Sequence, residues 1–189
     1  MNVVKDISNI LKRGNNIKEL QQGNHKAWKN FFDEYYPLLF RYILLRVNNR
    51  EVAQDLTSDV LVNIVRYVKH KEKKVDNVRA FVYTAARNRV IDYYRSRNNE
   101  RLMVNIEKVS ETLLSDEQES ELKNVEDTHS IVKLLQEVDE QDRELIIMRY
   151  IDELSHKEIA AIIGKNETSV RVQIHRIMNS IKEQNTNNL

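Results

Sequence analysis

Glycine and proline are scarce in this chain, and their scarcity constrains its fold more than any other feature does. The 189 residues include 3 Gly and 1 Pro. No dipeptide typical of a hairpin separates alternating runs, and apolar residues recur at intervals of three and four residues, which is the helical period. So few glycines also cannot supply the glycine-rich loops that hold phosphates in many nucleotide-binding enzymes. We therefore predict an all-α fold and exclude those enzyme classes.

Composition excludes several further classes. The chain has no Cys, so it can form no disulfide framework, zinc ribbon or thiol nucleophile. Its 5 His form no motif with metal-ligand spacing. No apolar run approaches the ~20 residues of a membrane helix, and residues 1–14 lack a secretory pattern. We expect a cytoplasmic protein that uses no cofactor or metal, inserts into no membrane and is not an enzyme.

The formal net charge of +1 conceals two opposed blocks. Residues 66–101 carry 11 Lys+Arg and 4 Asp+Glu, a net charge of +7, whereas residues 102–140 carry 3 and 11, a net charge of −8. Residues 105–128 are acidic, lack aromatics and are weakly periodic, which is typical of a flexible linker. We predict two small helical domains, 1–101 and 130–189, joined by an acidic linker at 102–129. As one alternative, the acidic residues 102–140 are also predicted to fold over the basic block in the free protein and to block DNA binding.

The second domain has the signals of a helix-turn-helix. Asp139 is placed to cap a first helix, which continues through the run RELIIMRYI. Ser155 and Glu158 form a capping box for a second helix, which Gly164 should end. Asn166 is placed to cap a third helix, whose core-facing stripe comprises Val170, Ile174, Ile177 and Ile181.

The opposite face of that third helix carries side chains suited to DNA. Arg, His and Asn can donate hydrogen bonds to base edges and phosphates, and Val172 can contact a thymine methyl group. A helix-turn-helix presents its second helix to the major groove in this way. The candidate DNA-binding residues are Thr168, Ser169, Arg171, Val172, His175 and Arg176, with Asn179 on the same face. The alternative is a helical hairpin whose outer face is only solvated.

Residues from 78 onward predict a basic helix with Arg and Tyr interleaved. The residues that fall within ~80° of one another on a helical wheel are Arg79, Tyr83, Arg87, Tyr94, Arg97 and Arg101. Guanidinium groups neutralise phosphates and tyrosine rings stack on unpaired bases, so this face suits single-stranded nucleic acid. The alternative is a solvated Arg-rich face with tyrosines over apolar neighbours. Asp92 is expected to pair with Arg89 or Arg95.

Two earlier segments also predict helices. Residues 50–68 have a core stripe of Val52, Leu56, Val60, Ile64 and Val68, and an opposite side of Asp55, Ser58, Asp59, Val62 and Arg66. The paired acids lack a third ligand for a metal, so a protein-contact surface is the favoured role. Aromatic residues between Trp28 and Phe40 recur at helical spacing and are assigned to the core, with Pro37 expected to kink or restart their helix.

Taken in order, these segments resemble the bacterial sigma factors, specifically the two-domain extracytoplasmic-function (ECF) group, over roughly residues 23–183. The core-binding helix of that family resembles REVAQDLTSDVLVNIVRYV, and its promoter-melting helix resembles VRAFVYTAARNRVIDYYRSR. Its C-terminal promoter-binding domain resembles VDEQDRELIIMRYIDELSHKEIAAIIGKNETSVRVQIHRIMNSI. The resemblance implies that the first domain binds core RNA polymerase and the minus-ten promoter element. It implies that the second binds the minus-thirty-five element and the polymerase flap, and that an anti-sigma factor is a partner.

The resemblance also assigns roles to individual residues. Polymerase contact is implied for Asp55, Ser58, Asp59 and Val62, with Ser58 standing where the family usually has Gln. The melting pattern is matched by Arg87, Asn88, Asp92, Tyr93 and Arg95, with Arg89 in place of a usual apolar residue and Thr84 in place of a common basic one. In the last helix Arg171, His175 and Arg176 match, and Gln173 replaces a frequent Arg.

Other functional classes remain as alternatives. A helix-turn-helix regulator could bind DNA without polymerase, although the first hundred residues lack the βαβ pattern of a receiver domain. A helical adaptor that binds only protein is disfavoured by the Arg/Tyr face. An enzyme is the least favoured class.

Overall fold

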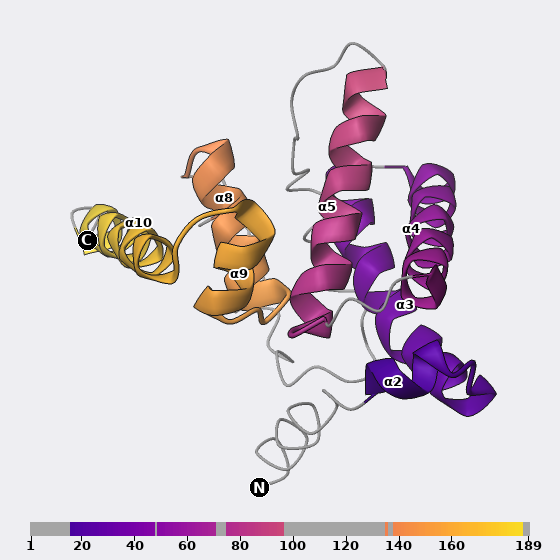
Figure 1. The fold of residues 1–189 in the computed structure, drawn as a ribbon. Helices are drawn as coiled ribbons and strands as arrows, with labels where there is room; N and C mark the ends of the chain where they lie inside the picture. Colours follow the sequence, from indigo (N-terminus) through magenta and orange to yellow (C-terminus); the bar gives the residue numbers. More distant parts are fainter. Residues whose placement is uncertain (1–15, 48, 71–74, 97–134, 136–137, 187–189) are drawn as a thin grey trace, which may run out of the picture.

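Helices make up all the regular structure that is described. The protein is represented by a computed structural model that describes residues 16–47, 49–70, 75–96, 135 and 138–186 (Figure 1). Within these ranges the prediction of an all-α fold is confirmed. The elements are α2 (Asn16–Gln21), α3 (His25–Val47), α4 (Arg50–His70), α5 (Val78–Ser96), α8 (Glu140–Ile146), η2 (Ile147–Ile151), α9 (His156–Ile163) and α10 (Glu167–Thr186). The predicted linker at 102–129, its contact with the basic block, Arg97 and Arg101 lie outside the described residues.

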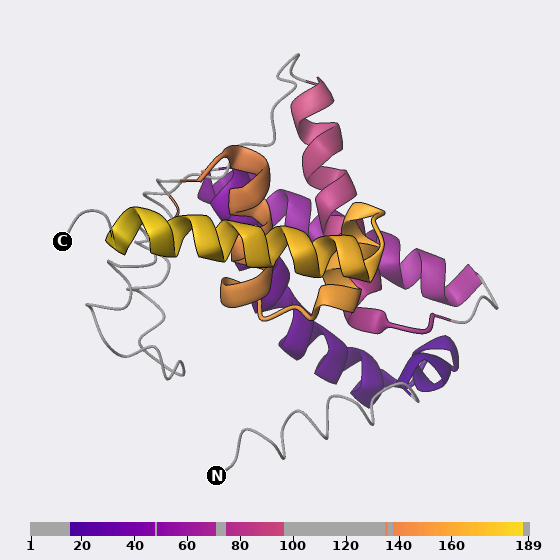
Figure 2. The ribbon, with the colours of Figure 1, turned by 90° about the vertical axis from the view of Figure 1, so that its left-hand side faces the viewer.

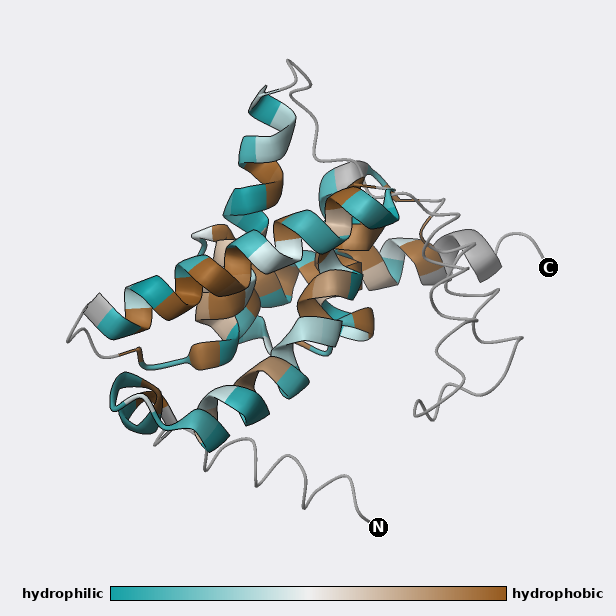
Figure 3. Ribbon diagram, turned by 90° about the vertical axis from the view of Figure 1, so that its right-hand side faces the viewer, coloured by the Kyte–Doolittle hydropathy of each residue, from teal (hydrophilic) through white to brown (hydrophobic). Residues whose placement is uncertain are grey.

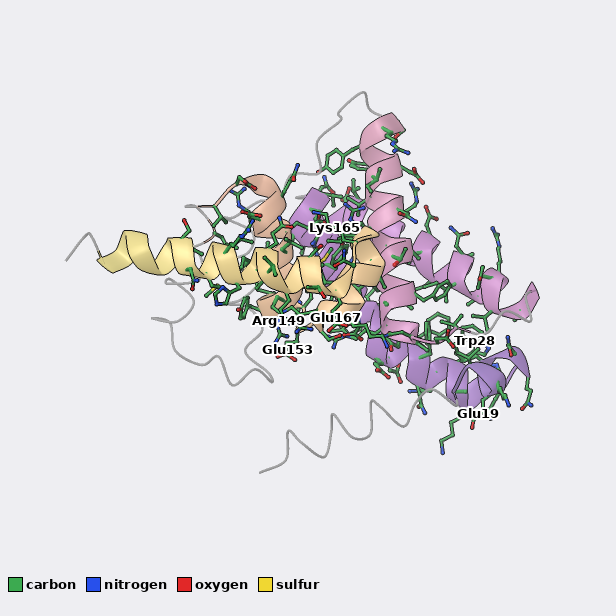
Figure 4. The ribbon with its side chains drawn as sticks, turned by 60° about the vertical axis from the view of Figure 1, so that its left-hand side comes forward. Glu19, Trp28, Arg149, Glu153, Lys165 and Glu167 are labelled. Atoms are coloured by element: carbon green, nitrogen blue, oxygen red, sulfur yellow. The ribbon has the colours of Figure 1, made fainter. Side chains whose placement is uncertain are left out.

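The first domain is built from α3, α4 and α5, which pack against one another. On α4 the predicted stripe is confirmed, because Leu56, Val60, Ile64 and Val68 are buried and Val52 is half-buried, while the five residues predicted opposite are exposed. Trp28 anchors the short helix α2, since its Nε1 donates a hydrogen bond to the Leu20 carbonyl at 3.0 Å (Figure 4). Figure 3 shows the hydrophobic residues gathered where the helices face one another.

The aromatic run on α3 lies mostly in the core, as predicted. Trp28, Phe31, Tyr35 and Leu39 are buried, and Tyr36 is 38% exposed. Pro37 does not restart the helix, because α3 continues through it from His25 to Val47. Proline removes one backbone donor from a helix, and here the packing of the buried aromatic rings outweighs that loss.

The predicted caps of the second domain are confirmed. The Asp139 carboxylate accepts a hydrogen bond from the Asp142 amide at 2.9 Å. Ser155 and Glu158 form both bonds of the capping box, and Gly164 ends α9 with a φ of 71°. The Asn166 side chain accepts from the Ser169 amide at 2.7 Å at the start of α10. All four residues of the predicted α10 stripe are buried, so short-range signals define this helix-turn-helix.

The run RELIIMRYI differs from the regular helix that we predicted, because its last turn is π-helical (η2). The Asp152 amide donates to the Ile147 carbonyl, five residues back, at 2.9 Å. One residue later Glu153 has a φ of 52°, in the left-handed region that non-glycine residues rarely occupy. Turns of this kind occur often at functional positions, and here the wide turn redirects the backbone at residues 151–154.

The two domains pack against each other. Figure 1 shows α8 and α9 lying between α10 on one side and α5 on the other, and α5 contacts α9 directly. In Figure 2, α10 lies across α8 and α9 on the side away from the first domain. The buried residues of both domains form one continuous apolar cluster. No helix in the described part of the chain has the length and apolar character that a membrane span requires.

Candidate nucleic-acid interface

The outer face of α10 is open to solvent. Every residue predicted there is exposed: Thr168, Ser169, Arg171, Val172, His175 and Arg176. The Arg171 guanidinium forms an ion pair of 3.1 Å with Glu167, one turn earlier on the same helix. Figure 4 labels Glu167 near the start of α10. The face therefore presents donors, a cation and an apolar contact together, which is the chemistry of major-groove binding.

Gln173 has a structural role within this domain. Its Nε2 donates to the Asp142 carboxylate at 2.8 Å and joins α10 to α8. The side chain is half-buried, so it lies beside the exposed face and not on it.

The outer face of α4 is also exposed, and it carries Asp55, Ser58, Asp59 and Val62. The Ser58 hydroxyl donates to the Gln54 carbonyl of its own helix at 2.9 Å. Val62 is 47% exposed, which leaves an apolar side chain on the same face as the two acids. This combination suits contact with another protein, because removing an exposed apolar side chain from water is favourable and would stabilise the complex.

Arg89 pairs with an acid on a neighbouring helix. Its Nη2 lies 2.7 Å from the Asp59 carboxylate, so it joins α5 to α4. Asp92 instead pairs with Arg95, at 3.9 Å. The prediction that Asp92 pairs with Arg89 or Arg95 is thus confirmed for Arg95. Arg89 pairs with Asp59 on the adjacent helix.

The Arg/Tyr face of α5 is covered by the second domain, whereas we expected it to be available for bases. The Arg79 guanidinium donates to the carbonyls of Asp152 and Glu153, the latter at 3.1 Å. The Arg87 Nε lies 3.3 Å from the Glu144 carboxylate. Tyr83 is 0% exposed, and its ring meets the Tyr42 ring edge-on at 5.3 Å. The first half of this face therefore forms a contact between the domains.

The second half of α5 extends past that contact. Asn88 and Arg95 are exposed. Tyr94 is half-buried, and its hydroxyl donates a hydrogen bond to the Arg46 carbonyl. Of the predicted melting residues that the structure describes, Asn88 and Arg95 are thus open to solvent and Tyr94 is partly covered. Tyr83 is buried against Tyr42, and Arg79 and Arg87 face the second domain.

Residues that the sequence analysis missed complete this contact. Arg46 is 1% exposed, stacks over the Tyr42 ring at 3.4 Å and reaches the Glu144 carboxylate at 4.0 Å. The Arg41 Nη2 donates to the Ile151 carbonyl at 3.0 Å. Arg46 follows Leu39, Tyr42 and Ile43 at core spacing, which is a signal that could have identified it as buried.

Asp152 is the buried acid of the contact, with 1% of its surface exposed. Its carboxylate lies 3.9 Å from the Arg41 guanidinium and accepts no hydrogen bond from the residues that the structure describes. Burial raises the pKa of this carboxyl above its ordinary value, although Arg46, Arg41 and Arg79 act in the opposite direction. Burial likewise raises the pKa of the Tyr83 phenol.

Models of known protein families match two parts of this chain. Residues 31–100 match the model of Sigma-70 region 2, and residues 128–181 match that of Sigma-70, region 4. Together the two matches cover more than half of the chain. The ECF RNA polymerase sigma factor BldN of Streptomyces coelicolor is 23% identical over 165 residues, 87% of this chain and 62% of BldN. The RNA polymerase sigma factor YlaC of Bacillus subtilis is 26% identical over 161 residues, 84% of this chain and 91% of YlaC.

Solved structures share the fold. CnrH, in complex with the cytosolic domain of CnrY, has a TM-score of 0.62 and 17% identity, over 92% of this chain and 97% of CnrH. RpoE from Bartonella quintana, in complex with the anti-sigma factor NepR, has a TM-score of 0.56 and 20% identity, over 84% and 96% of the two chains.

An all-α chain in which sigma region 2 precedes region 4 is a sigma factor, the class of protein that initiates transcription. Within that class, this chain belongs to the ECF type.

Proposed function

We propose that this protein directs core RNA polymerase to specific promoters and initiates transcription by recognising the promoter and melting DNA. The observation that carries the proposal is the outer face of α10, where all six predicted DNA-binding residues are exposed while the opposite stripe is buried. In a helix-turn-helix, the helix that follows the turn lies in the major groove, and we assign α10 in this way to the minus-thirty-five element.

The polymerase contact is proposed for the exposed face of α4. Asp55, Asp59 and Val62 offer two acids and an apolar side chain on one surface, and Ser58 lies among them. The minus-ten element and the separated strand are assigned to α5 and the residues that follow it, through Arg79, Tyr83, Arg87, Asn88, Tyr94, Arg95 and Arg97. The proposed division into domains at 1–101 and 130–189, with a linker at 102–129, is supported by the two matched ranges.

The mechanism is binding without covalent chemistry, and the protein is proposed to act in the cytoplasm, without enzymatic activity or a cofactor. Melting requires unpairing and unstacking of bases, which polymerase contacts and capture of the exposed bases offset. An anti-sigma factor is proposed as a further partner, because RpoE, which shares the fold, was solved with one.

Run-off transcription with purified core RNA polymerase tests the proposal. A library of promoter fragments from the source genome serves as template, and we expect initiation at defined sites only when this protein is present. Arg176→Ala should reduce initiation, whereas Lys18→Ala on α2, which removes the same charge far from α10, should not. If the protein binds duplex DNA yet never supports initiation by core polymerase, it is a helix-turn-helix regulator and the proposal is wrong.

A further inference from the structure

Two side chains on the outer face of α10, His175 and Asn179, are bonded to each other. Both residues are exposed and lie one turn apart. The Asn179 Nδ2 lies 3.2 Å from the His175 Nδ1. Within the described residues, no other hydrogen bond joins two side chains of the predicted DNA-binding face. The bond restricts how the imidazole can turn and which of its nitrogens carries the hydrogen.

The chemistry of the amide determines the tautomer of His175. An amide nitrogen donates hydrogen bonds and does not accept them. The Asn179 Nδ2 therefore donates, and the His175 Nδ1 accepts with its lone pair. In a neutral imidazole one nitrogen accepts and the other carries the hydrogen, so the hydrogen of His175 is on Nε2. This nitrogen has no partner among the residues that the structure describes, and it remains a donor for a ligand.

The position of this donor suits the major groove. Figure 2 shows α10 lying across α8 and α9 on the side away from the first domain. His175 belongs to the N-terminal half of this helix, and the N-terminal residues of a recognition helix contact base edges. Arg171, one turn earlier, is already paired with Glu167 at 3.1 Å. The Nε2 hydrogen of His175 is thus a donor of defined direction beside a cation that is partly neutralised.

A single donor distinguishes the bases by their acceptors. In the major groove guanine presents N7 and O6, adenine presents N7, thymine presents O4, and cytosine presents only a donor. Cytosine would leave the Nε2 hydrogen facing another hydrogen, which costs free energy in a contact without water. Thymine places a methyl group beside O4, and the apolar Val172 suits that group better than an imidazole does. The purine N7 is the acceptor that remains.

We propose that His175 recognises a purine in duplex DNA by donating a hydrogen bond from Nε2 to N7, and that Asn179 is a positioning residue that keeps the hydrogen on Nε2. The proposal rests on the proposed function for its ligand, duplex DNA. It assigns a class of base to one residue of α10, and it gives Asn179 a role that requires no contact with DNA.

Long-range proton–nitrogen correlation spectra of the full-length protein test the role of Asn179 without DNA. The chain has 5 His, and the signals that disappear in His175→Gln belong to His175. In alkaline buffer, where imidazoles are neutral, the wild type should carry the hydrogen on Nε2. Asn179→Asp should move it to Nδ1, because a carboxylate only accepts. Ser180→Asp, which places the same charge on the neighbouring exposed residue, should not.

Two spectroscopic results would overturn the proposal. One is a hydrogen on Nδ1 in the wild type. The other is the same tautomer in the wild type and in Asn179→Asp, because the neighbouring amide would then have no influence on the ring.

Binding to modified duplexes tests the purine contact. A duplex is selected from a random-sequence pool by the full-length protein, alone or with core polymerase, and is resynthesised with a deazapurine at each purine in turn. This analogue lacks the N7 acceptor and keeps base pairing. At one position it should weaken binding of the wild type by about fivefold, the effect of one lost hydrogen bond, and it should not weaken binding of His175→Ala further. Asn179→Ala should lose part of this difference, and Ser180→Ala should keep all of it.

The same duplex distinguishes a base from the DNA backbone, since a phosphate oxygen is also an acceptor. If a neutral methylphosphonate abolished the difference between the wild type and His175→Ala while no deazapurine did so, His175 would contact phosphate and the proposal would be wrong. Equal sensitivity of the two proteins to every deazapurine would also overturn it.

These measurements separate this proposal from the proposed function, because neither of them requires initiation. Loss of run-off transcription with a retained purine effect would reject promoter-directed initiation and keep the contact of His175. Initiation at defined sites without a purine effect would reject that contact alone. If no duplex sequence is selected, both proposals are rejected.

Discussion

Arg46 illustrates how a single charged residue is held inside the first domain. Its guanidinium stacks on Tyr42 at 3.4 Å, donates to the Tyr42 carbonyl at 2.8 Å and faces Glu144 across the domain contact. Its own carbonyl accepts from the Tyr94 hydroxyl. A buried cation is tolerated only when such partners surround it, so this one residue connects the ring of α3, the end of α5 and the second domain.

Replacement of Arg46 should therefore destabilise the protein strongly. We expect Arg46→Ala to lower the free energy of unfolding by about 3 kcal/mol, because the substitution leaves Glu144 without one of its counter-charges and removes packing around Tyr42. Urea unfolding followed by circular dichroism measures the change. Arg66→Ala, at an exposed position of α4, should shift the same free energy by at most about 0.5 kcal/mol; equal effects of the two substitutions would show that burial of Arg46 is unimportant.

At the same scale, Arg87 distinguishes strand opening from duplex binding. In the polymerase complex we expect Arg87→Ala to reduce promoter opening by about tenfold, since a charge-assisted contact to the separated strand is lost. Permanganate footprinting reports the opening, and duplex affinity should change less. Undiminished opening would remove Arg87 from the melting face. Tyr83→Ala is a poorer test, because removing a buried ring costs about 3–5 kcal/mol of stability.

At the scale of elements, the turn between α9 and α10 depends on backbone conformation more than on space. A Cβ added to Gly164 would meet no atom within 4 Å, yet the φ of 71° disfavours any side chain. The capping box fixes the start of α9, and the Asn166 cap fixes the start of α10 at the turn itself. The angle at which α10 is presented thus follows from a few local groups.

Substitutions at Gly164 should rank by their tolerance of the left-handed region. Gly164→Ala should lower the free energy of unfolding by about 1 kcal/mol, and Gly164→Asn should lower it less, because Asn adopts this conformation more readily. Thermal unfolding of the two variants beside the wild type gives the order. If Gly164→Ala were as stable as the wild type, the φ of residue 164 would not restrict which residue the turn accepts.

The elements also show what sequence could predict and why. Caps, the α4 stripe and the α10 stripe depend on groups within a few residues of one another, and all were predicted correctly. The π-helical turn, the uninterrupted α3 through Pro37 and the burial of Tyr83 depend on packing between segments distant in sequence. Side-chain pattern alone shows which face of α5 is basic and aromatic, but not that residues 144–153 cover it.

At the scale of the whole molecule, the buried Asp152 makes the stability of the folded protein depend on pH. Burial raises the pKa of its carboxyl above the ordinary 3.8, against the effect of Arg46, Arg41 and Arg79 and with a smaller contribution in the same direction from Glu144. The folded protein then binds this proton more tightly than the unfolded chain does. Its contribution to stability is fullest below pH 3.8 and falls as pH rises through the raised value.

Asp152→Asn isolates this contribution. We expect the unfolding free energy of the wild type, relative to that of Asp152→Asn, to decrease as pH increases from acid toward neutrality. Urea unfolding of both proteins at a series of pH values supplies the difference. A difference that increases with pH would mean that the arginines, and not burial, dominate the titration of Asp152.

The carbonyl contacts of Arg41 and Arg79 have an evolutionary consequence. Their acceptors at residues 151, 152 and 153 are main-chain oxygens, which every amino acid possesses. Relatives can therefore diverge in the exposed side chain at position 153 and still keep these bonds, provided that the two arginines and the wide turn persist. Selection on the carbonyl contacts should consequently be visible at Arg41 and Arg79 and nearly silent at position 153.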